Sequence, residues 1–413
     1  MTTRTRACRS CGAALTATFC DLGMSPPSNA YRTAETLDQA EAFYPLHAWV
    51  CGTCFLVQLE QFQSPDEIFS EYAYFSSMSD SWLAHCEAYA DGAITSLRLD
   101  TKSQVIEIAS NDGYLLQFFH RQGIPVLGIE PAANVAKHAE AKGIRSIVKF
   151  FGVNTARELV AALTRADLLI GNNVLAHVPD LNDFIAGLAV LLAPTGTINM
   201  EFPHLLRLME ENQFDTIYHE HFSYLSLLAV RTAFERHGLV IFDVEEVRTH
   251  GGSLRIHARH AADASRPVTE RVRALDKREQ AAGLDSLAAY GAFDEQVKET
   301  KRALLAFLIE ARRAGKRIAG YGAAAKGNTL LNYCGIRADF LDYVVDRSPH
   351  KQGRFLPGTH LPILAPGHLA VTRPDYVLIL PWNIAPEVME QMAHIRSWGG
   401  RFVVPIPRVT VLA

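Results

Sequence analysis

The sequence contains no apolar run long enough to cross a bilayer. Its longest, AGLAVLLAP at 186–194, falls well short of the roughly 20 residues that a membrane helix needs. The N-terminal residues, MTTRTRACRSCG, lack the apolar core of a signal peptide. No basic cluster is present either, and 40 Lys and Arg against 44 Asp and Glu give a net charge of −4. We therefore expect a cytoplasmic protein without a membrane or nucleic-acid partner.

The sequence also lacks internal repeats and low-complexity segments, and its 413 residues are too many for one ordinary core. With 48% hydrophobic and 20% charged residues, it has the composition of a soluble globular enzyme. We expect an α/β protein of three domains. These are a small Cys- and Pro-containing domain over residues 1–75, an open α/β domain over 76–265 and a second, smaller α/β domain over 266–413.

Residues 80–260 alternate short β-rich runs with amphipathic helices, which is the pattern of an open parallel sheet. The predicted strands are VIEIA (105–109), PVLGIE (125–130), SIVKFF (146–151), DLLIGNNVL (167–175) and TINMEF (197–202). After a helix predicted over 285–314 the alternation restarts, with strands in RIAGYGAA, LDYVVD, DYVLILP and RFVVPIP. Two such doubly wound units are typical of a protein that binds two nucleotide-like ligands.

Four of the seven cysteines form two pairs with the spacing of zinc knuckles, Cys8-Arg-Ser-Cys11 and Cys51-Gly-Thr-Cys54. In the reducing cytosol, paired cysteines predict metal ligands before disulfides. Four thiolates complete a tetrahedral site and leave no position for water, so we expect a structural zinc ion that does no chemistry. Chance proximity of the thiols and a redox pair of the thioredoxin type are the alternatives.

The loop after the first strand of the central domain, Glu107-Ile-Ala-Ser-Asn-Asp-Gly113, opens a helix. Gly113 permits a close turn there. Glu130 ends the next strand, where a carboxylate can accept both ribose hydroxyls of an adenosine. A dinucleotide site would need the sequence G-x-G-x-x-G, which this loop lacks. The alternative is that both carboxylates are only solvated charges at strand ends.

This central block resembles the class I S-adenosylmethionine-dependent methyltransferases. The resemblance makes the loop that begins at Glu107 a variant of their first motif, and Glu130 their ribose-binding acid. It places Asn172-Asn173-Val-Leu-Ala-His177 in their fourth motif. The cofactor-binding residues implied in this way are Glu107, Ala109, Asn111, Gly113, Glu130, Asn172 and Asn173, where Ala109 and Asn111 stand in place of the usual glycines.

The densest cluster of polar and aromatic residues is Tyr218-His-Glu-His221, with Tyr224 close behind it. On a helix, His221 would share one face with Tyr218 and with Tyr224, whereas Glu220 would face elsewhere. Two histidines two residues apart diverge on a helix, which disfavours a metal site, and a buried structural histidine is the other alternative. We expect His221 to be an active-site base, because histidine titrates near neutral pH.

Together with the cysteine pairs and the later sheet, this cluster resembles the sugar C-methyltransferase family. The resemblance implies an N-terminal zinc-binding domain, a central Rossmann-like class I methyltransferase domain and a smaller Rossmann-like domain that binds a nucleotide sugar. It implies C-3 methylation of a thymidine-diphosphate (dTDP) 4-keto-6-deoxysugar bearing a 3-amino group, in deoxysugar and antibiotic biosynthesis. The residues themselves leave open whether carbon 3 carries an amine or a hydroxyl, and whether the enzyme is a monomer.

The chemistry of such a substrate assigns roles to the cluster. The C4 ketone acidifies the proton on carbon 3, so that a base can remove it to give an enolate. His221 is the expected base, and Tyr218 and His177 are expected to donate hydrogen bonds to the oxyanion at C4. Glu220 either orients a histidine or binds the sugar amine. Tyr72 either reaches into the site or is a packing aromatic.

A second glycine loop, GYGAAAKGN at 320–328, follows a strand and begins a helix. Backbone N–H groups at a helix N-terminus, with Lys326 beside them, suit a diphosphate, although a tight strand–helix turn explains the glycines equally well. Asp346 ends the next strand, where a ribose or base can meet it. The polar segment HGGSLR at 250–255 is expected to be a further loop near the sugar or phosphate. The expected substrate-binding residues are Tyr224, Ser253, Arg255, Gly322, Lys326, Asn328 and Asp346.

Two other functions fit parts of the sequence. An NAD(P)-dependent nucleotide-sugar oxidoreductase with a structural zinc ion would account for two nucleotide-binding units, but neither glycine loop has the G-x-G-x-x-G sequence. A non-catalytic nucleotide-sugar-binding protein would have no need of a base in the Tyr-His-Glu-His cluster. We therefore expect the methyltransferase.

Overall fold

The structure, a computed structural model, describes residues 6–69, 77, 80–162 and 165–412. The chain forms two compact units. The first unit contains Met1–Thr16, Cys51–His204 and Phe222–Asp285, and the second contains Ala17–Val50, Leu205–His221 and Ser286–Ala413. Two internal segments therefore belong to the second unit although the chain on both sides of them belongs to the first.

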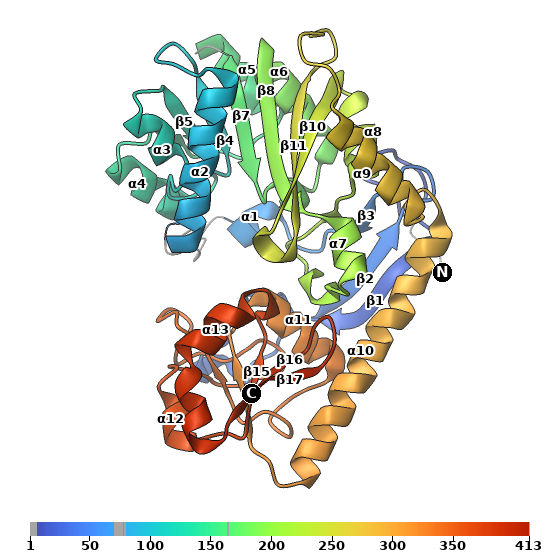
Figure 1. Cartoon of the computed structure of the whole chain (residues 1–413), viewed down its shortest axis with the longest axis vertical. Helices are drawn as coiled ribbons and strands as arrows, with labels where there is room; N and C mark the ends of the chain where they lie inside the picture. Colours follow the sequence, from blue (N-terminus) through green and yellow to red (C-terminus); the bar gives the residue numbers. More distant parts are fainter. Residues whose placement is uncertain (1–5, 70–76, 78–79, 163–164, 413) are drawn as a thin grey trace. The chain divides into compact units, whose positions relative to one another are not determined.

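The first unit is built on a seven-stranded sheet with the order β10-β11-β8-β7-β4-β5-β6 (Figure 1). Strands β4 to β8 pair in parallel, and β10 and β11 extend one edge in antiparallel order. The strands are β4 (Val105–Ile108), β5 (Val126–Ile129), β6 (Ser146–Ile147), β7 (Ala166–Asn172), β8 (Leu192–Pro203), β10 (Leu239–Val247) and β11 (Ser253–His260). The five predicted parallel strands are thereby confirmed, although β6 is much shorter than its predicted run.

The two antiparallel strands correct one prediction. Residues 250–255 are not one polar loop, because the turn between β10 and β11 consists of residues 248–252. Ser253 begins β11, and Arg255 lies within that strand. A separate short pair in this unit, β3 (Val57–Leu59) with β9 (Ser223–Tyr224), is antiparallel as well.

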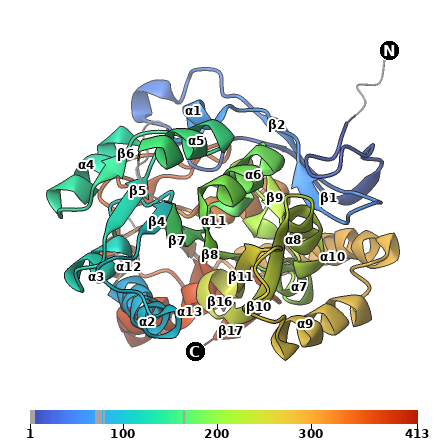
Figure 2. The ribbon, with the colours of Figure 1, turned by 90° about the horizontal axis from the view of Figure 1, so that it is seen from above.

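Helices cover both faces of the seven-stranded sheet (Figure 2). One core contains side chains of α2, α3 and α4 together with β4 and β7. On the other face α5 packs against α6, which lies beside α8. The helices of this unit are α1 (Pro65–Phe69), α2 (Asp80–Leu97), α3 (Leu116–Arg121), α4 (Ala133–Ala141), α5 (Val153–Ala162), α6 (Leu181–Leu191), α8 (Leu227–Glu235) and α9 (Glu270–Ala281). No helix in the described part of the chain is long and apolar enough to cross a membrane.

The second unit is built on a smaller, six-stranded sheet with the order β14-β13-β12-β15-β16-β17. All of its strand pairs are parallel except β16 with β17. These strands are β12 (Ile318–Tyr321), β13 (Val344–Val345), β14 (Ile363–Leu364), β15 (Tyr376–Ile379), β16 (Arg401–Val404) and β17 (Thr410–Leu412). The prediction of a second, smaller doubly wound sheet is confirmed.

Helices α12 and α13 share one core with this sheet, while α10 reaches β15 through an edge-to-face contact of Phe307 with Tyr376. An antiparallel ribbon of β1 (Ala17–Ser25) and β2 (Tyr44–Val50) packs on α10, where Phe19 stacks on Phe293 with ring centroids 4.7 Å apart. The helices are α7 (Leu205–Glu210), α10 (Leu287–Arg313), α11 (Ala325–Cys334), α12 (His368–Thr372) and α13 (Ala385–Gln391).

A buried carboxylate joins three elements of the first unit. Glu279 of α9 is 1% exposed, and its Oε1 accepts hydrogen bonds from the Leu227 N–H at 2.7 Å and from His204 Nε2 at 2.8 Å. Its Oε2 accepts from the Leu228 N–H at 2.8 Å. Glu279 thus satisfies N–H groups that the first turn of α8 cannot pair internally, and it holds His204 after β8.

We expect Glu279→Ala to lower the free energy of unfolding by about 3–5 kcal/mol, because three donors, two of them on fully buried residues, lose their acceptor. Glu270→Ala on the same helix is the matched control, since that exposed side chain makes only a surface ion pair, and its effect should stay within about 0.5 kcal/mol. Urea unfolding of the two variants measures the difference. Equal effects would contradict the role assigned to Glu279.

Candidate active site

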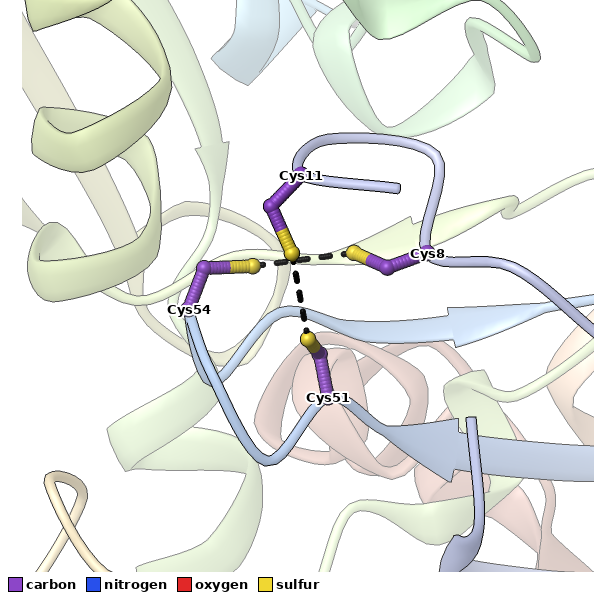
Figure 3. A group of neighbouring side chains, drawn as sticks. All are labelled: Cys8, Cys11, Cys51 and Cys54. Atoms are coloured by element: carbon purple, nitrogen blue, oxygen red, sulfur yellow. Dashed lines mark hydrogen bonds between the residues drawn. The ribbon is translucent and has the colours of Figure 1, made fainter. Parts of the chain in front are cut away.

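The four predicted zinc ligands come together in the first unit (Figure 3). Their sulfur atoms all lie within 4.8 Å of one another, with Cys8 and Cys54 at 3.6 Å and Cys11 and Cys51 at 3.4 Å. A tetrahedral zinc ion with Zn–S bonds of about 2.3 Å separates its ligands by about 3.8 Å, so these cysteines fit zinc. No comparable group of His, Cys, Asp or Glu occurs elsewhere among the described residues, the His-Glu-His run included.

The knuckles are held by polar groups around the sulfur atoms. Gln58 Nε2 donates to Cys8 Sγ at 3.2 Å, and the Thr53 N–H donates to Cys51 Sγ at 3.4 Å. Asn182 of α6 donates to the backbone carbonyl of Ser10 at 3.0 Å, which attaches the first knuckle to this helix. Such outer contacts orient the ligands before a metal binds.

We expect purified protein to contain about one zinc ion per chain and Cys51→Ser to lose it, because a structural site needs all four thiolates. The variant should also melt at a lower temperature. Cys334→Ser is the control, since Cys334 is a buried thiol outside the cluster. Elemental analysis with a thermal melt measures both quantities, and zinc retained by Cys51→Ser would refute a four-cysteine site.

The loop after β4 keeps a glycine-like backbone without the glycines. Ala109, Asn111 and Gly113 all have positive φ values, of 57°, 48° and 74°. Glycine adopts this conformation freely, asparagine tolerates it, and alanine pays a steric cost in it. The departures of Ala109 and Asn111 from the common motif therefore change the residues of the loop but not its left-handed backbone.

Glu130 at the end of β5 holds this loop. Its Oε2 accepts from the Asn111 N–H and its Oε1 from the Ala132 N–H, both at 2.9 Å. Burial raises the pKa of Glu130, and these two N–H groups oppose the rise. Each carboxylate oxygen has a second lone pair, so Glu130 still has the capacity to accept ribose hydroxyls.

Glu107 on β4 is fully buried, and neither of its carboxylate oxygens makes a well-formed hydrogen bond within the described chain. Burial raises its pKa far above the usual range, more than the neighbouring Tyr114 hydroxyl lowers it. An unpaired buried carboxylate is costly unless a ligand pairs it. The Glu107 carboxylate is therefore suited to accept hydrogen bonds from a ligand, such as the ammonium group of a bound amino acid moiety.

Asn172 and Asn173 lie where β7 ends. The Asn172 amide is 3.5 Å from the Tyr114 hydroxyl, and the Asn173 N–H donates to the Glu201 carbonyl at 2.7 Å in the neighbouring strand. Asn173 has a positive φ of 54°, which turns the chain away from the sheet. His177 follows in a short 3₁₀ turn and is half-buried.

Tyr218, Glu220 and His221 lie on a reverse turn of the second unit, not on a helix. The His221 N–H donates to the Tyr218 carbonyl at 2.9 Å, and the two rings have centroids 4.0 Å apart. The expected pairing of these two side chains holds in this turn. The prediction that Tyr224 shares a helix face with His221 is wrong, because Tyr224 lies in β9 of the first unit.

The other side chains of this turn are buried. His219 is 4% exposed, and its Nε2 lies 3.3 Å from the Pro45 carbonyl oxygen. Burial lowers the pKa of His219, and its contacts with backbone carbonyls oppose that shift. Glu220 is 8% exposed, and its Oε1 accepts from Asn29 Nδ2 at 2.7 Å. Burial raises the pKa of Glu220, and the Asn29 amide opposes that shift.

The second glycine loop leads from β12 into α11. Gly322 has a φ of 93°, and a Cβ there would lie 2.4 Å from Pro381 Cδ, so close packing requires this glycine. Lys326 Nζ donates to Asn383 Oδ1 at 2.8 Å. Asn328 is fully buried, and neither polar atom of its amide has a partner among the described residues. This helix start thus offers a lysine and an unpaired amide to a ligand.

Two expected substrate residues have partners within the protein. Asp346 accepts from the Ala323 N–H at 2.7 Å and from the Ser348 N–H at 2.8 Å, and so supports the glycine loop. Arg255 donates to Glu201 at 2.7 Å and to Glu245 at 3.2 Å in the first unit.

Ser253 donates to the Thr249 carbonyl at 3.1 Å, which closes the turn before β11. The Tyr224 side chain is 5% exposed on β9. Tyr72 lies outside the described residues.

Asp215, which no sequence motif indicated as a site residue, is fully buried just before the Tyr218–His221 turn. Its Oδ2 accepts from Trp382 Nε1 at 2.8 Å. Burial raises the pKa of Asp215 to about 7, and the Lys326 ammonium opposes this shift. The only sequence signal was an acidic residue inside the apolar run Phe214-Asp-Thr-Ile217.

Three family models cover nearly the whole chain. Residues 8–69 match a zinc binding domain, 83–244 a methyltransferase domain, and 248–407 a C-methyltransferase C-terminal domain. Together with the cysteine cluster and the two α/β sheets, these matches define an S-adenosylmethionine-dependent methyltransferase with a zinc-binding domain. S-adenosylmethionine is its cofactor and zinc its structural metal.

The chain is 35% identical to C-methyltransferase NovU of Streptomyces niveus over 409 residues, 98% of this chain and 96% of that protein. It therefore belongs to this family of C-methyltransferases, as predicted. A ubiquinone biosynthesis O-methyltransferase of Rhodopseudomonas palustris (strain BisA53) is 30% identical over 93 residues, 22% of this chain and 37% of that protein.

Among solved structures, PH0226 of Pyrococcus horikoshii aligns with 48% of this chain and 99% of its own, at 16% identity and a TM-score of 0.37. A score this low does not by itself establish a common fold. Family membership therefore rests on the NovU relative and on the three domain matches.

We expect Ala109→Gly to raise the free energy of unfolding by about 1 kcal/mol, because glycine relieves the left-handed strain at that position. Ala292→Gly, at an exposed position within α10, should lower it by about 1 kcal/mol instead. Chemical denaturation of the two variants measures the opposite signs. A loss of stability in Ala109→Gly would mean that its left-handed backbone is not strained.

Proposed function

We propose that this C-methyltransferase methylates carbon 3 of a dTDP-linked 4-keto-6-deoxysugar, with His221 as the base. The observation that carries the proposal is the orientation of the His221 ring. Its Nδ1 lies 2.9 Å from the Thr216 carbonyl oxygen, which can only accept a hydrogen bond. Neutral His221 therefore carries its proton on Nδ1 and its lone pair on Nε2, as a base requires.

In this proposal His221 removes the proton from carbon 3, and the negative charge moves to the oxygen at C4. Tyr218, whose ring lies against His221, and His177 donate hydrogen bonds to that oxyanion. S-adenosylmethionine supplies an electrophilic methyl group for the enolate carbon when it is bound. Glu107 is proposed to pair its amine and Glu130 its ribose hydroxyls.

Glu220 is proposed to bind the substituent on carbon 3. One of its oxygens is taken by Asn29, and the carboxylate is otherwise nearly enclosed, so a sugar amine or hydroxyl would meet an oriented acceptor. The dTDP diphosphate is proposed to bind at the N-terminus of α11, with Lys326 and the unpaired amide of Asn328 as its side-chain partners.

We also propose that Tyr224, Ser253, Arg255, Gly322 and Asp346 line the substrate site. The polar contacts of Arg255 and Asp346 favour supporting roles for these two side chains. We further propose that the enzyme is cytoplasmic and monomeric. The oxidoreductase alternative gains no support, because the domain matches and the NovU relative are all methyltransferases.

The experiment that tests the proposed substrate is a methyl-transfer assay against a panel of dTDP-4-ketosugars that differ in the group on carbon 3. Mass spectrometry of the products identifies the methylated carbon. Transfer to carbon 3 of a 3-amino sugar supports the proposal in full, and preference for a 3-hydroxy sugar corrects the substituent. Transfer to oxygen or nitrogen would refute it.

We expect His221→Asn to abolish transfer while S-adenosylmethionine still binds with unchanged affinity, because the variant loses the base but none of the residues assigned to the cofactor. The rate should fall by about 10²- to 10⁴-fold. His394→Asn, at an exposed position of the second unit, is the control. Calorimetric cofactor binding and single-turnover assays measure the two effects. Full activity of His221→Asn would assign the base to another residue, with Tyr218 the next candidate.

A further inference from the structure

A short stretch of the N-terminal region contacts both parts of the proposed substrate site in the second unit. Asn29 Nδ2 donates to Glu220 Oε1 at 2.7 Å. Two residues later, the Tyr31 hydroxyl donates to the Ala323 carbonyl at 2.5 Å, in the glycine loop before α11. One stretch thus touches the carboxylate assigned to carbon 3 and the loop assigned to the diphosphate.

The Ala323 peptide is fixed at both ends. Its N–H donates to Asp346 Oδ2 at 2.7 Å, and its carbonyl accepts from Lys351 Nζ at 2.9 Å as well as from Tyr31. Lys351 also lies 5.6 Å from the centre of the Tyr31 ring. Because this peptide leads directly into α11, its orientation determines where the first N–H groups of that helix point.

Two further contacts close a ring between this stretch, α11 and the Tyr218–His221 turn. Ser28 Oγ lies 3.4 Å from Thr329 Oγ1, and Thr329 Oγ1 donates to the Ile217 carbonyl at 3.1 Å. The stretch is therefore anchored to α11, and α11 is anchored to the chain that enters the turn. A shift of one of these three elements changes the place of the other two.

We propose that Asn29 and Tyr31 are positioning residues for methyl transfer. Asn29 holds the Glu220 carboxylate toward the substituent on carbon 3, and Tyr31 holds the glycine loop in the conformation that receives the diphosphate. The inference rests on the function proposed above for Glu220 and for α11. It places part of the substrate site in residues 8–69, the zinc-binding domain of the family.

The two side chains can be tested separately, because they act on different parts of the substrate. Asn29 is exposed and Tyr31 is half-buried, so neither Asn29→Ala nor Tyr31→Phe opens a cavity in the core. Asn154→Ala, at an exposed position of α5, and Tyr343→Phe, which removes a hydroxyl bonded to Thr372, are the matched controls. Thermal melts of all four variants verify that they are folded.

We expect Asn29→Ala to lower kcat on the preferred ketosugar by about 10- to 100-fold, the effect of losing one hydrogen bond to a charged group, with little change in KM. Tyr31→Phe should instead weaken the binding of dTDP alone by about tenfold, measured by calorimetry. A merely structural role would lower the melting temperature and move kcat and dTDP affinity together. Results equal to those of the controls would overturn the two roles.

The wild-type enzyme separates this inference from the proposed function. If it binds dTDP and methylates a ketosugar while both variants behave like their controls, only the positioning roles fail. If it neither binds dTDP nor methylates any sugar of the panel, the proposed function fails, and the roles of Asn29 and Tyr31 fail with it.

Discussion

The coordination of four thiolates fixes where a long N-terminal loop begins and ends. The sulfur atoms of Cys11 and Cys51 lie 3.4 Å apart, so the two ends of the segment formed by residues 12–50 are close together. Closing such a loop costs conformational entropy, which zinc coordination offsets. Within the loop, β1 and β2 pair in antiparallel order and so hold its two halves together. Asn29 and Tyr31 lie in the loop closed in this way. The zinc ligands thus set both ends of the segment that contains these two side chains.

The cofactor loop depends on a similar constraint, supplied by a carboxylate instead of a metal. Alanine in the left-handed region costs roughly 1–2 kcal/mol, which the surrounding contacts must offset. Glu130 supplies one of them, because it accepts the N–H group of Asn111, two residues after Ala109. Its other oxygen accepts the Ala132 N–H at the start of α4. The residue expected to bind ribose therefore also shapes the loop that lies beside it. A change at Glu130 affects the backbone and the ligand together.

The sequence was sufficient to predict features that local patterns encode. Buried parallel strands appear as apolar runs, and CxxC spacing encodes the zinc ligands, so both sheets and the four cysteines could be predicted. The edge strands β10 and β11 carry mixed polar and apolar residues, so the sequence around their glycine-containing turn predicts a longer loop than the structure has. Contacts between distant segments leave no local pattern. Asn29 meets Glu220 across 191 residues, and Asp215 meets Trp382 across 167, so both were missed.

Each of the two units has a fully buried polar side chain for which a bound ligand could supply hydrogen-bond partners. Glu107 on β4 in the first unit and Asn328 in α11 of the second are fully buried, and among the described residues their polar side-chain atoms make no well-formed hydrogen bond. Each unpaired group costs about 1–3 kcal/mol in the free protein. By contrast, Glu130, Glu220 and Asp215 each have an N–H partner within the protein. A ligand that pairs Glu107 or Asn328 recovers that cost on binding, so these two side chains favour occupied sites over empty ones.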